Sequence, residues 1–209
     1  MALYPVFLDL DGRQCVVVGG GVVAERRILS LLEAGARVTV VSPGLTAALG
    51  DLATARRIRH VARPYQPGDL AEAVLVFTSA GDEGVTPAVA REARDRGLWL
   101  NAADDPGHCS FYLPGIVHRG VLTVAVGSGG TSPALTRAMR EHLDGTLGRE
   151  WAALGELAAT ARRELHAAGR SVHAEAWRRA LGSDVRALLS EGRVDEARRR
   201  LRARLELPA

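Results

Sequence analysis

The stretch CVVVGGGVVAERRILSLLEAGARVTVVSP, residues 15–43, decides the fold. It opens on a short Val-rich run that leads into three consecutive glycines. Apolar residues then recur at helical spacing, a glycine stands where the helix would end, and a second Val-rich run follows. The helical positions are Ala24, Ile28, Leu31 and Leu32, and Gly35 is the expected C-cap. The pattern predicts a strand, a helix and a second strand.

The same alternation continues toward the middle of the chain. Short apolar runs occupy residues 57–62, 73–80 and 97–104. Continuous apolar strands joined by helices are typical of a parallel sheet buried on both faces, because a strand with one exposed face alternates apolar and polar residues. We therefore predict an α/β first domain built on a doubly wound parallel sheet.

The glycines after the first strand match a phosphate-binding pattern. Gly19, Gly21 and Ala24 form G-x-G-x-x-A between a predicted strand and a predicted helix. The first glycine permits a tight turn, the second lets a pyrophosphate approach the backbone, and the small third residue lets the helix pack on the strand. The N–H groups and dipole of the helix N-terminus favour an anion. A turn that binds nothing is the alternative, but the strand and helix context favours a dinucleotide site.

One residue of the dinucleotide pattern is missing. An acid that holds the ribose hydroxyl normally follows the second strand. Here that strand ends in Ser42, Pro43 and Gly44. Because a serine cannot make the bidentate contact that rejects a 2′-phosphate, this position leaves the choice between NAD and NADP open.

The composition narrows the class of protein. The chain has 209 residues, 47% of them hydrophobic, which suits one α/β domain with a smaller appendage. The formal charge is only +3 and no basic run is interleaved with aromatic residues, so we expect no nucleic-acid partner. The two cysteines lie far apart and the histidines lack paired spacing, so we expect neither a disulfide framework nor a resident metal. No apolar run is long enough to span a membrane and the start is unlike a signal peptide, so we expect a cytoplasmic protein without a membrane partner.

Two further stretches each have two interpretations. In NAADDPGHCSF, residues 101–111, Asp104 and Asp105 follow a predicted strand, and such a pair either forms a turn or handles protons. In VAVGSGGTSPALTRAMREHL, residues 125–144, Ser132 and Pro133 begin a helix. The glycine-rich loop before it is either a well-capped helix start or an anion site. The basic residues that could add charge to such a site are His118, Arg119, Arg137 and Arg140.

Together and in this order, these stretches resemble a known family. The matching segments are YPVFLDLDGRQCVVVGGGVVAERR, NAADDPGHCSFYLP and VAVGSGGTSPALTRAMRE, within residues 3–145. The chain resembles the precorrin-2 dehydrogenase and sirohydrochlorin ferrochelatase family, the N-terminal module of siroheme synthase, in its stand-alone form. The resemblance implies NAD-dependent oxidation of precorrin-2 to sirohydrochlorin in siroheme biosynthesis. It leaves open whether iron or cobalt is then inserted, with the metal as a substrate held by the macrocycle. An NAD(H)-sensing regulatory module without catalysis is the alternative.

The resemblance assigns roles to residues. Asp104 matches the family's catalytic aspartate and would take a pyrrole proton, with Asp105 as the fallback. The residues expected to bind the carboxylate arms of the tetrapyrrole or to line its crevice are Asn101, Ser128, Thr131 and Ser132. The residues expected to bind NAD are Gly19, Gly20, Gly21, Val22, Val23, Ser42, Pro43, Gly44, Thr78 and Ser79. Where the family has an ATD-like run, this chain has Ala80 and Gly81, so we expect Thr78, Ser79 or Asp82 to serve instead.

The resemblance also implies a homodimer in which the segment after residue 110 crosses to the partner. We predict a Rossmann-type NAD-binding domain at residues 1–112, a dimerisation region of two antiparallel strands and a helix at 113–147, and a C-terminal helical domain at 148–209. In that last domain the apolar spacing predicts three helices, with Trp177, Leu181, Val185 and Leu188 on the second. The run DEARRRLRAR, residues 195–204, is expected to be a solvated basic face, and a lid that binds carboxylates is the alternative.

Overall fold

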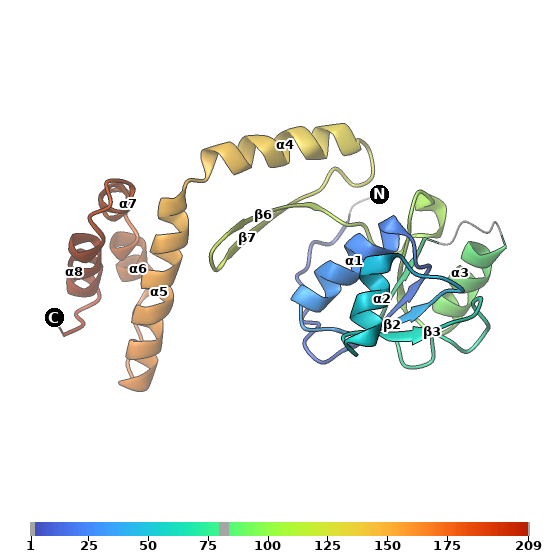
Figure 1. Ribbon diagram of the computed structural model, residues 1–209. Coiled ribbons are helices and arrows are strands. Elements are labelled where there is room, and N and C mark those ends of the chain that lie inside the picture. Colours follow the sequence, from blue (N-terminus) through green and yellow to red (C-terminus); the bar gives the residue numbers. More distant parts are fainter. Residues whose placement is uncertain (1–2, 80–83, 209) are drawn as a thin grey trace. The chain divides into compact units, whose positions relative to one another are not determined.

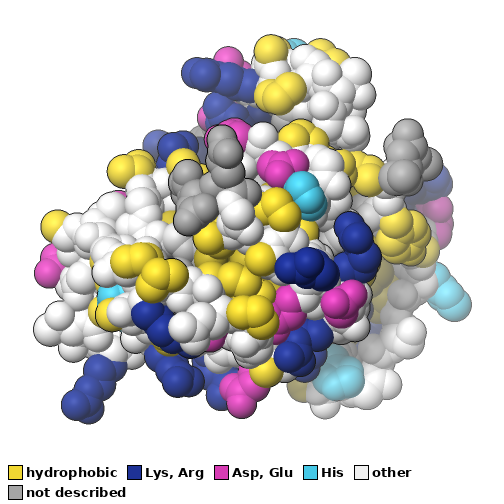
Figure 2. Space-filling model, turned by 90° about the vertical axis from the view of Figure 1, so that its right-hand side faces the viewer, with side chains coloured by type: hydrophobic (Ala, Val, Ile, Leu, Met, Phe, Trp, Pro, Cys, Tyr) yellow, Lys and Arg dark blue, Asp and Glu magenta, His cyan; other side chains and the backbone are white. Residues whose placement is uncertain are grey.

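The structure is a computed structural model that describes residues 3–79 and 84–208. The chain divides into two compact units, Met1–Leu113 and Pro114–Ala209, and each is described by itself (Figure 1). Over the face drawn in Figure 2, basic, acidic and hydrophobic side chains are interspersed.

The first unit is a five-stranded sheet with helices on both faces. Its sheet order is β3-β2-β1-β4-β5, and every neighbouring pair is parallel. The strands are β1 (Gln14–Val18), β2 (Arg37–Val41), β3 (Arg59–Val61), β4 (Leu75–Thr78) and β5 (Trp99–Ala102), and the helices are α1 (Val22–Glu33), α2 (Ala47–Thr54) and α3 (Val85–Asp95). The predicted doubly wound parallel sheet is confirmed.

Alternate residues of β1 separate the two cores of this unit. Cys15 and Val17 are buried in the cluster that includes residues of α1 and α2. Val16 and Val18 are buried in the cluster that includes residues of α3. Figure 1 shows α1 and α2 on one side of the sheet and α3 on the other. Chain order reverses between β1 and β4, and in open sheets of this kind ligands bind at the carboxyl ends of the strands beside that point.

The second unit begins with a two-stranded hairpin and a helix. β6 (Gly115–Arg119) pairs antiparallel with β7 (Leu122–Val126) around a tight turn, as the sequence predicts. In that turn Gly120 has a φ of 58°, a conformation that favours glycine. α4 (Pro133–Thr146) follows, and none of its side chains is buried within this single chain.

Helices complete the second unit, and one prediction about them is wrong. They are α5 (Arg149–Ala167), α6 (Ala174–Ala180), α7 (Ser183–Ser190) and α8 (Val194–Arg204). The segment expected to be one helix is α6 and α7, because the chain breaks at Gly182, which is the N-cap of α7. As a result Leu181 is partly exposed, whereas Val185 and Leu188 are buried.

The hairpin packs closely on α5. A Cβ atom built on Gly155 of α5 would lie 2.7 Å from Val121 Cγ2, so the glycine is what admits the hairpin tip. The division of this unit into separate regions at 113–147 and 148–209 stays a prediction.

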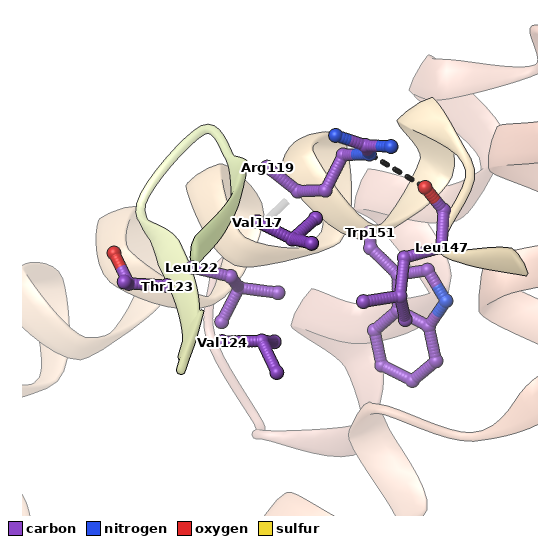
Figure 3. Close-up of a pocket in the computed structure, with 7 residues that line it drawn as sticks. All are labelled: Val117, Arg119, Leu122, Thr123, Val124, Leu147 and Trp151. Carbon is purple, nitrogen blue, oxygen red and sulfur yellow. Dashed lines mark hydrogen bonds between the residues drawn. The ribbon is translucent and has the colours of Figure 1, made fainter. Parts of the chain in front are cut away.

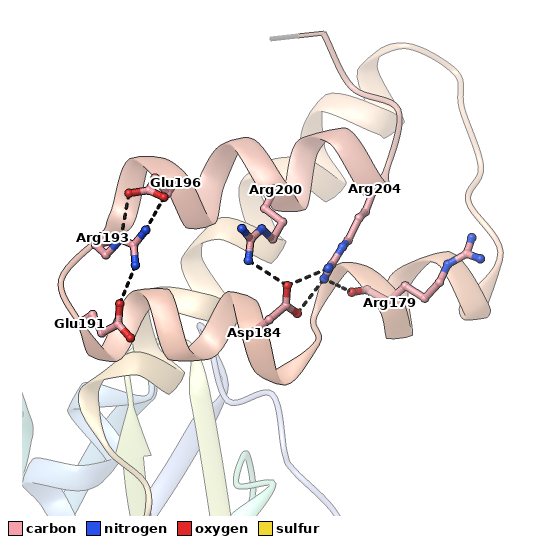
Figure 4. A network of polar contacts seen from close by, with 7 residues as sticks. All are labelled: Arg179, Asp184, Glu191, Arg193, Glu196, Arg200 and Arg204. Carbon is pink, nitrogen blue, oxygen red and sulfur yellow. Dashed lines mark hydrogen bonds and ion pairs between the residues drawn. The ribbon is translucent and has the colours of Figure 1, made fainter.

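The arginine-rich run on α8 keeps Arg198, Arg199 and Arg200 exposed, as expected of a solvated face, and several of its arginines form ion pairs (Figure 4). Arg204 binds both oxygens of Asp184 on α7, at 2.9 and 2.7 Å, and Arg200 lies 3.2 Å from the same carboxylate. The hydrogen bond from Arg204 is the main reason why the pKa of Asp184 is lowered to about 2. Arg202 reaches Glu164 on α5 at 2.8 Å. These contacts tie α8 to α5 and α7.

Candidate functional site

The first glycine turn contains two glycines that the chain itself requires and one that faces open space. Gly19 has a φ of 119°, and a Cβ atom there would lie 2.9 Å from Ser79 Oγ. A Cβ atom on Gly20 would collide with the carbonyl oxygen of Gly44. A Cβ atom on Gly21 would meet nothing within 4 Å. The open side of Gly21 is therefore where a ligand can approach the backbone.

The helix that starts at this turn has no side-chain cap. Gly21 is the N-cap of α1, and no side chain accepts a hydrogen bond from the first turn. A helix N-terminus presents N–H groups without helical partners and the positive end of the helix dipole. The turn therefore fits the pyrophosphate of a dinucleotide.

Two buried hydroxyls lie beside the same turn, at the end of β4. Thr78 is 1% exposed, and neither Thr78 Oγ1 nor Ser79 Oγ has a hydrogen-bond partner among the described residues. The Ser79 backbone N–H donates to the Val18 carbonyl at 2.9 Å, which holds Ser79 against the glycine turn. Because a buried hydroxyl without a partner is unfavourable, these two atoms are candidate hydrogen-bonding groups for a cofactor. Asp82, the third residue expected here, lies outside the described residues together with Ala80 and Gly81.

The end of β2 is arranged differently. Ser42 is 7% exposed, and its hydroxyl donates to the Gly44 carbonyl at 2.7 Å. Its own carbonyl lies 2.9 Å from Nε2 of His60, which donates to it. Pro43 and Gly44 are exposed. The Ser42 side chain therefore stabilises its own turn, and a contact of residues 42–44 with the cofactor stays a prediction.

The two neighbouring aspartates have different surroundings. Asp104 is exposed, has a φ of 59°, and its carboxylate has no hydrogen-bond or ion-pair partner in the described part of the chain. Asp105 precedes the short 3-10 helix η1 (Pro106–His108), and its Oδ2 lies 2.6 Å from Nδ1 of His108. Of the two, Asp105 is therefore the turn-forming residue and Asp104 is the carboxylate available for chemistry.

Asp104 borders a hollow of about 420 Å³ between α1 and the segment after β5. Asn101 lies in the same lining and donates through Nδ2 to the Phe111 carbonyl at 3.0 Å. The lining consists of Val23, Arg26, Arg27, Asn101, Ala102, Ala103, Asp104, Asp105, Pro106, Cys109, Tyr112 and Leu113. The structure thus brings together Val23, Asn101 and Asp104, three residues that the sequence placed at a site.

The turn after β5 is braced by Cys109. Its Sγ accepts from the Ala102 N–H at 3.2 Å and lies 3.3 Å from the Ala102 carbonyl. Burial raises the pKa of this thiol, so the neutral form is favoured. Cys109 therefore holds the Asp104 turn in place.

In the second glycine turn the hydroxyls of Ser128 and Ser132 are already hydrogen-bonded within the chain. Ser132 is the N-cap of α4, and its Oγ accepts from the Leu135 N–H at 3.2 Å. Ser128 Oγ accepts from the Ser132 N–H at 3.1 Å and from Thr136 Oγ1 at 3.0 Å. Thr131 is exposed and its hydroxyl has no partner among residues 3–79 and 84–208. Among the predicted substrate-binding residues of this turn, Thr131 therefore has the hydroxyl that is available to a ligand.

The arginines expected to add charge at this turn already have partners. Arg119 donates through Nε to the Leu147 carbonyl at 2.5 Å, at the C-terminal end of α4, and borders an apolar pocket of about 180 Å³ with Trp151 (Figure 3). Arg137 lies 2.9 Å and Arg140 lies 3.3 Å from the Glu141 carboxylate. These arginines are therefore not free cations.

The sequence reasoning missed Arg26 and Arg27. Both lie on α1 one turn after the glycines and line the Asp104 hollow. The signal was available, since residues in the second turn of a helix that starts at a predicted anion site are near its ligand. It was passed over because arginines recur throughout this chain.

Two searches of the described residues concern other classes of site. No group of three or more His, Cys, Asp or Glu side chains is placed to hold a metal ion in the described ranges. Within those ranges no helix is both long enough and apolar enough to cross a bilayer.

Comparisons with known proteins find NAD(P)-binding relatives. The family described as "Putative NAD(P)-binding" matches residues 6–115, just over half of the 209 residues. The siroheme synthase of Nitrosomonas europaea is 36% identical over 211 residues, 99% of this chain and 44% of that protein. The siroheme synthase of Methylobacillus flagellatus is 43% identical over 159 residues, 76% of this chain and 34% of that protein. The chain therefore spans less than half the length of these relatives.

A solved structure extends the likeness to the whole chain. The structure of "SirC, precorrin-2 dehydrogenase" aligns with a TM-score of 0.73 and 26% identity, over 98% of this chain and 98% of that one. The chain therefore belongs to the NAD(P)-binding family that matches residues 6–115, and its resemblance to the precorrin-2 dehydrogenase family is confirmed.

Proposed function

We propose that this chain oxidises precorrin-2 to sirohydrochlorin with NAD as the hydride acceptor. The substrate loses one hydride and one proton, and the products are sirohydrochlorin, NADH and a proton. The full-length likeness to SirC and the likeness to siroheme synthases support this substrate.

The observation that carries the proposal is the free carboxylate of Asp104. It borders a hollow beside α1 and has no partner in the described residues, so it can accept the pyrrole proton directly. Asp105 is already bound to His108 at 2.6 Å and holds the turn. In this mechanism Asp104 takes the proton, and Asp105 holds the turn that positions Asp104.

The first glycine turn would bind the cofactor. NAD, when bound, supplies the hydride acceptor. The backbone at Gly21 admits the pyrophosphate, and the N-terminus of α1 stabilises its negative charge. The unpartnered hydroxyls of Thr78 and Ser79 would receive hydrogen bonds from the cofactor or donate them.

The second glycine turn would bind carboxylate arms of the tetrapyrrole. Thr131 offers a free hydroxyl, whereas Ser128 and Ser132 hold the loop in shape. A contact of either serine with the substrate would exchange a hydrogen bond within the loop for one to a substrate carboxylate.

We propose that the active form is a homodimer, formed through the hairpin and α4. Val121 is 62% exposed, Leu135 is 60% exposed and Met139 is 45% exposed. Apolar exposure of this extent on the hairpin and α4 is surface that a second copy would cover. Substituting aspartate for Leu135 and Met139 together is expected to give a monomer by light scattering, and an unchanged dimer would refute this interface.

An assay with purified protein tests the function. Precorrin-2 and NAD are supplied, and the absorbance of NADH and of sirohydrochlorin is followed together. We expect the two products to form in equal amounts. Folded protein that binds NAD but gives no turnover would refute the proposal and favour the NAD(H)-sensing alternative. Metal insertion, assayed with sirohydrochlorin and iron or cobalt, stays a prediction, as does a cytoplasmic location.

A further inference from the structure

Two arginines in the Asp104 hollow have no acidic partner. Arg26 is exposed and Arg27 is half-buried, and no described residue accepts a hydrogen bond from either guanidinium. Arg63 and Arg96 of this unit are paired, at 2.6 Å from Asp69 and 2.8 Å from Glu92, whereas Arg91 on α3, like Arg26 and Arg27, has no acidic partner among the described residues. What distinguishes Arg26 and Arg27 is their place: both residues line the hollow that Asp104 borders, and neither forms an ion pair there.

The surroundings of Arg27 favour an added anion. Burial lowers the pKa of Arg27, and the charge of Arg26 lowers it further. The guanidinium still carries its charge at neutral pH, because arginine pKa values lie above about 12. A half-buried cation beside a second cation is stabilised when a carboxylate or phosphate binds between them.

The rest of the lining suits a flat ring with acidic arms. Val23, Tyr112 and Leu113 offer partly exposed apolar surface. Asp104 lies in the same lining but forms no ion pair with either arginine. An apolar ring can therefore contact the apolar side chains while its arm reaches the arginines and its edge faces Asp104.

We propose that Arg27, assisted by Arg26, binds a carboxylate arm of the tetrapyrrole in the hollow that Asp104 borders. This inference rests on the proposed function. A phosphate of the cofactor has the same charge, but the lining of the hollow begins at Val23 and includes none of the three glycines. Arg27 is thus a substrate-binding and specificity residue, and the proton passes to Asp104.

The test compares Arg27→Gln, Arg27→Lys and a control, Arg91→Gln. Arg91 is an exposed arginine on α3, on the opposite face of the sheet. The measurements are the Kd of metal-free sirohydrochlorin by absorbance titration, the Kd of NAD, and KM and kcat for precorrin-2. For Arg27→Gln we expect a rise of about tenfold in the sirohydrochlorin Kd and in KM, as for loss of a hydrogen bond between charged groups. The NAD Kd and kcat should stay within about threefold, Arg27→Lys should restore part of the affinity, and Arg91→Gln should match the wild type.

The opposite results are equally clear. Wild-type sirohydrochlorin affinity and KM in Arg27→Gln would overturn the inference. A tenfold rise in the NAD Kd alone would assign the arginine to a cofactor phosphate and also overturn it. If the wild type binds sirohydrochlorin but does not oxidise precorrin-2, the proposed function fails, while the sirohydrochlorin titrations still show whether Arg27 binds the tetrapyrrole.

If circular dichroism shows Arg27→Gln to be unfolded, Arg26→Gln replaces it, because Arg26 is exposed. An unchanged sirohydrochlorin Kd in Arg26→Gln would then refute the proposal that the two arginines bind the tetrapyrrole.

Discussion

The two glycine turns of this chain start alike and end differently. Each follows a strand and leads into a helix, α1 in the first unit and α4 in the second. The first helix has no side-chain cap, and Gly21 faces open space. The second helix is capped by Ser132, and Ser128 bonds to the same loop.

The difference separates a turn that needs a ligand from one that is complete by itself. Helix N-terminal N–H groups must find partners. At α4 a serine of the chain supplies one, whereas at α1 a cofactor or water must do so. The same distinction divides Asp104, which is free, from Asp105, which is bound to His108.

The largest expected effect comes from Gly21→Asp. The new carboxylate would crowd and repel the pyrophosphate, so we expect the NAD Kd to rise at least about 100-fold. Because Gly21 has a φ of −86°, any residue fits there, and aspartate is a favoured N-cap. The free energy of unfolding without NAD should therefore stay the same or rise by a few tenths of a kcal/mol.

Isothermal titration and thermal unfolding measure the two effects. Gly50→Asp is the matched control, because a Cβ atom there also meets nothing within 4 Å but the residue lies in α2. An unchanged NAD titration in Gly21→Asp would mean that the cofactor does not bind at the first turn.

Ser132→Ala tests the complete turn. Loss of an N-cap serine typically lowers stability by about 1 kcal/mol, so we expect a loss of that size in the second unit. Thr131→Ala, which removes a hydroxyl without a partner, should leave stability unchanged within about 0.5 kcal/mol. Trp151 and Trp177 lie in the second unit and Trp99 lies in the first, so tryptophan fluorescence in urea is measured in a Trp99→Phe background, where both remaining tryptophans report the second unit. Equal losses in the two variants would contradict the assignment of the cap.

The smallest effect concerns the ion pairs of α8. Because the pKa of Asp184 falls to about 2 in the folded protein, its contribution to stability is present above the unfolded value of about 3.9 and is lost as the pH falls toward 2. Its side chain is 42% exposed, so the contribution is less than about 1 kcal/mol. Asp184→Asn should therefore lower the unfolding midpoint in urea at pH 7 and match the wild type near pH 2. A difference that persists at the lower pH would point to packing rather than charge.

The sequence predicts the fold correctly where the spacing of apolar residues or a glycine determines the local structure. The Val-rich runs predicted the parallel sheet because its central strands, β1 and β4, are buried on both faces. The helix break at Gly182 was missed because the apolar spacing from Trp177 to Leu188 continues across it. The ion pairs of the basic run on α8 were not predicted because the partners are remote in sequence: Arg202 pairs with Glu164 and Arg204 with Asp184.

The site residues were likewise predicted where the local sequence determines their position, and missed where remote contacts do. Local order along the chain placed Gly19–Gly21, Asn101 and Asp104 at the ends of strands. It did not decide between Asp104 and Asp105, since the choice depends on whether the turn brings His108 to Asp105. Nor did it identify Arg27, whose importance lies in the absence of an acidic partner within the described residues, which only the packed structure shows.

The most direct test of the account is the rate of precorrin-2 oxidation in Asp104→Asn and Asp105→Asn, measured with saturating NAD. Loss of positioned acid–base help predicts a kcat at least about 100-fold lower for Asp104→Asn, with NAD affinity within about threefold of the wild type. Asp105→Asn should be affected far less, because the asparagine can still bond to His108. A normal rate in Asp104→Asn, or the larger loss in Asp105→Asn, would contradict the claim that the uncommitted carboxylate carries the proton.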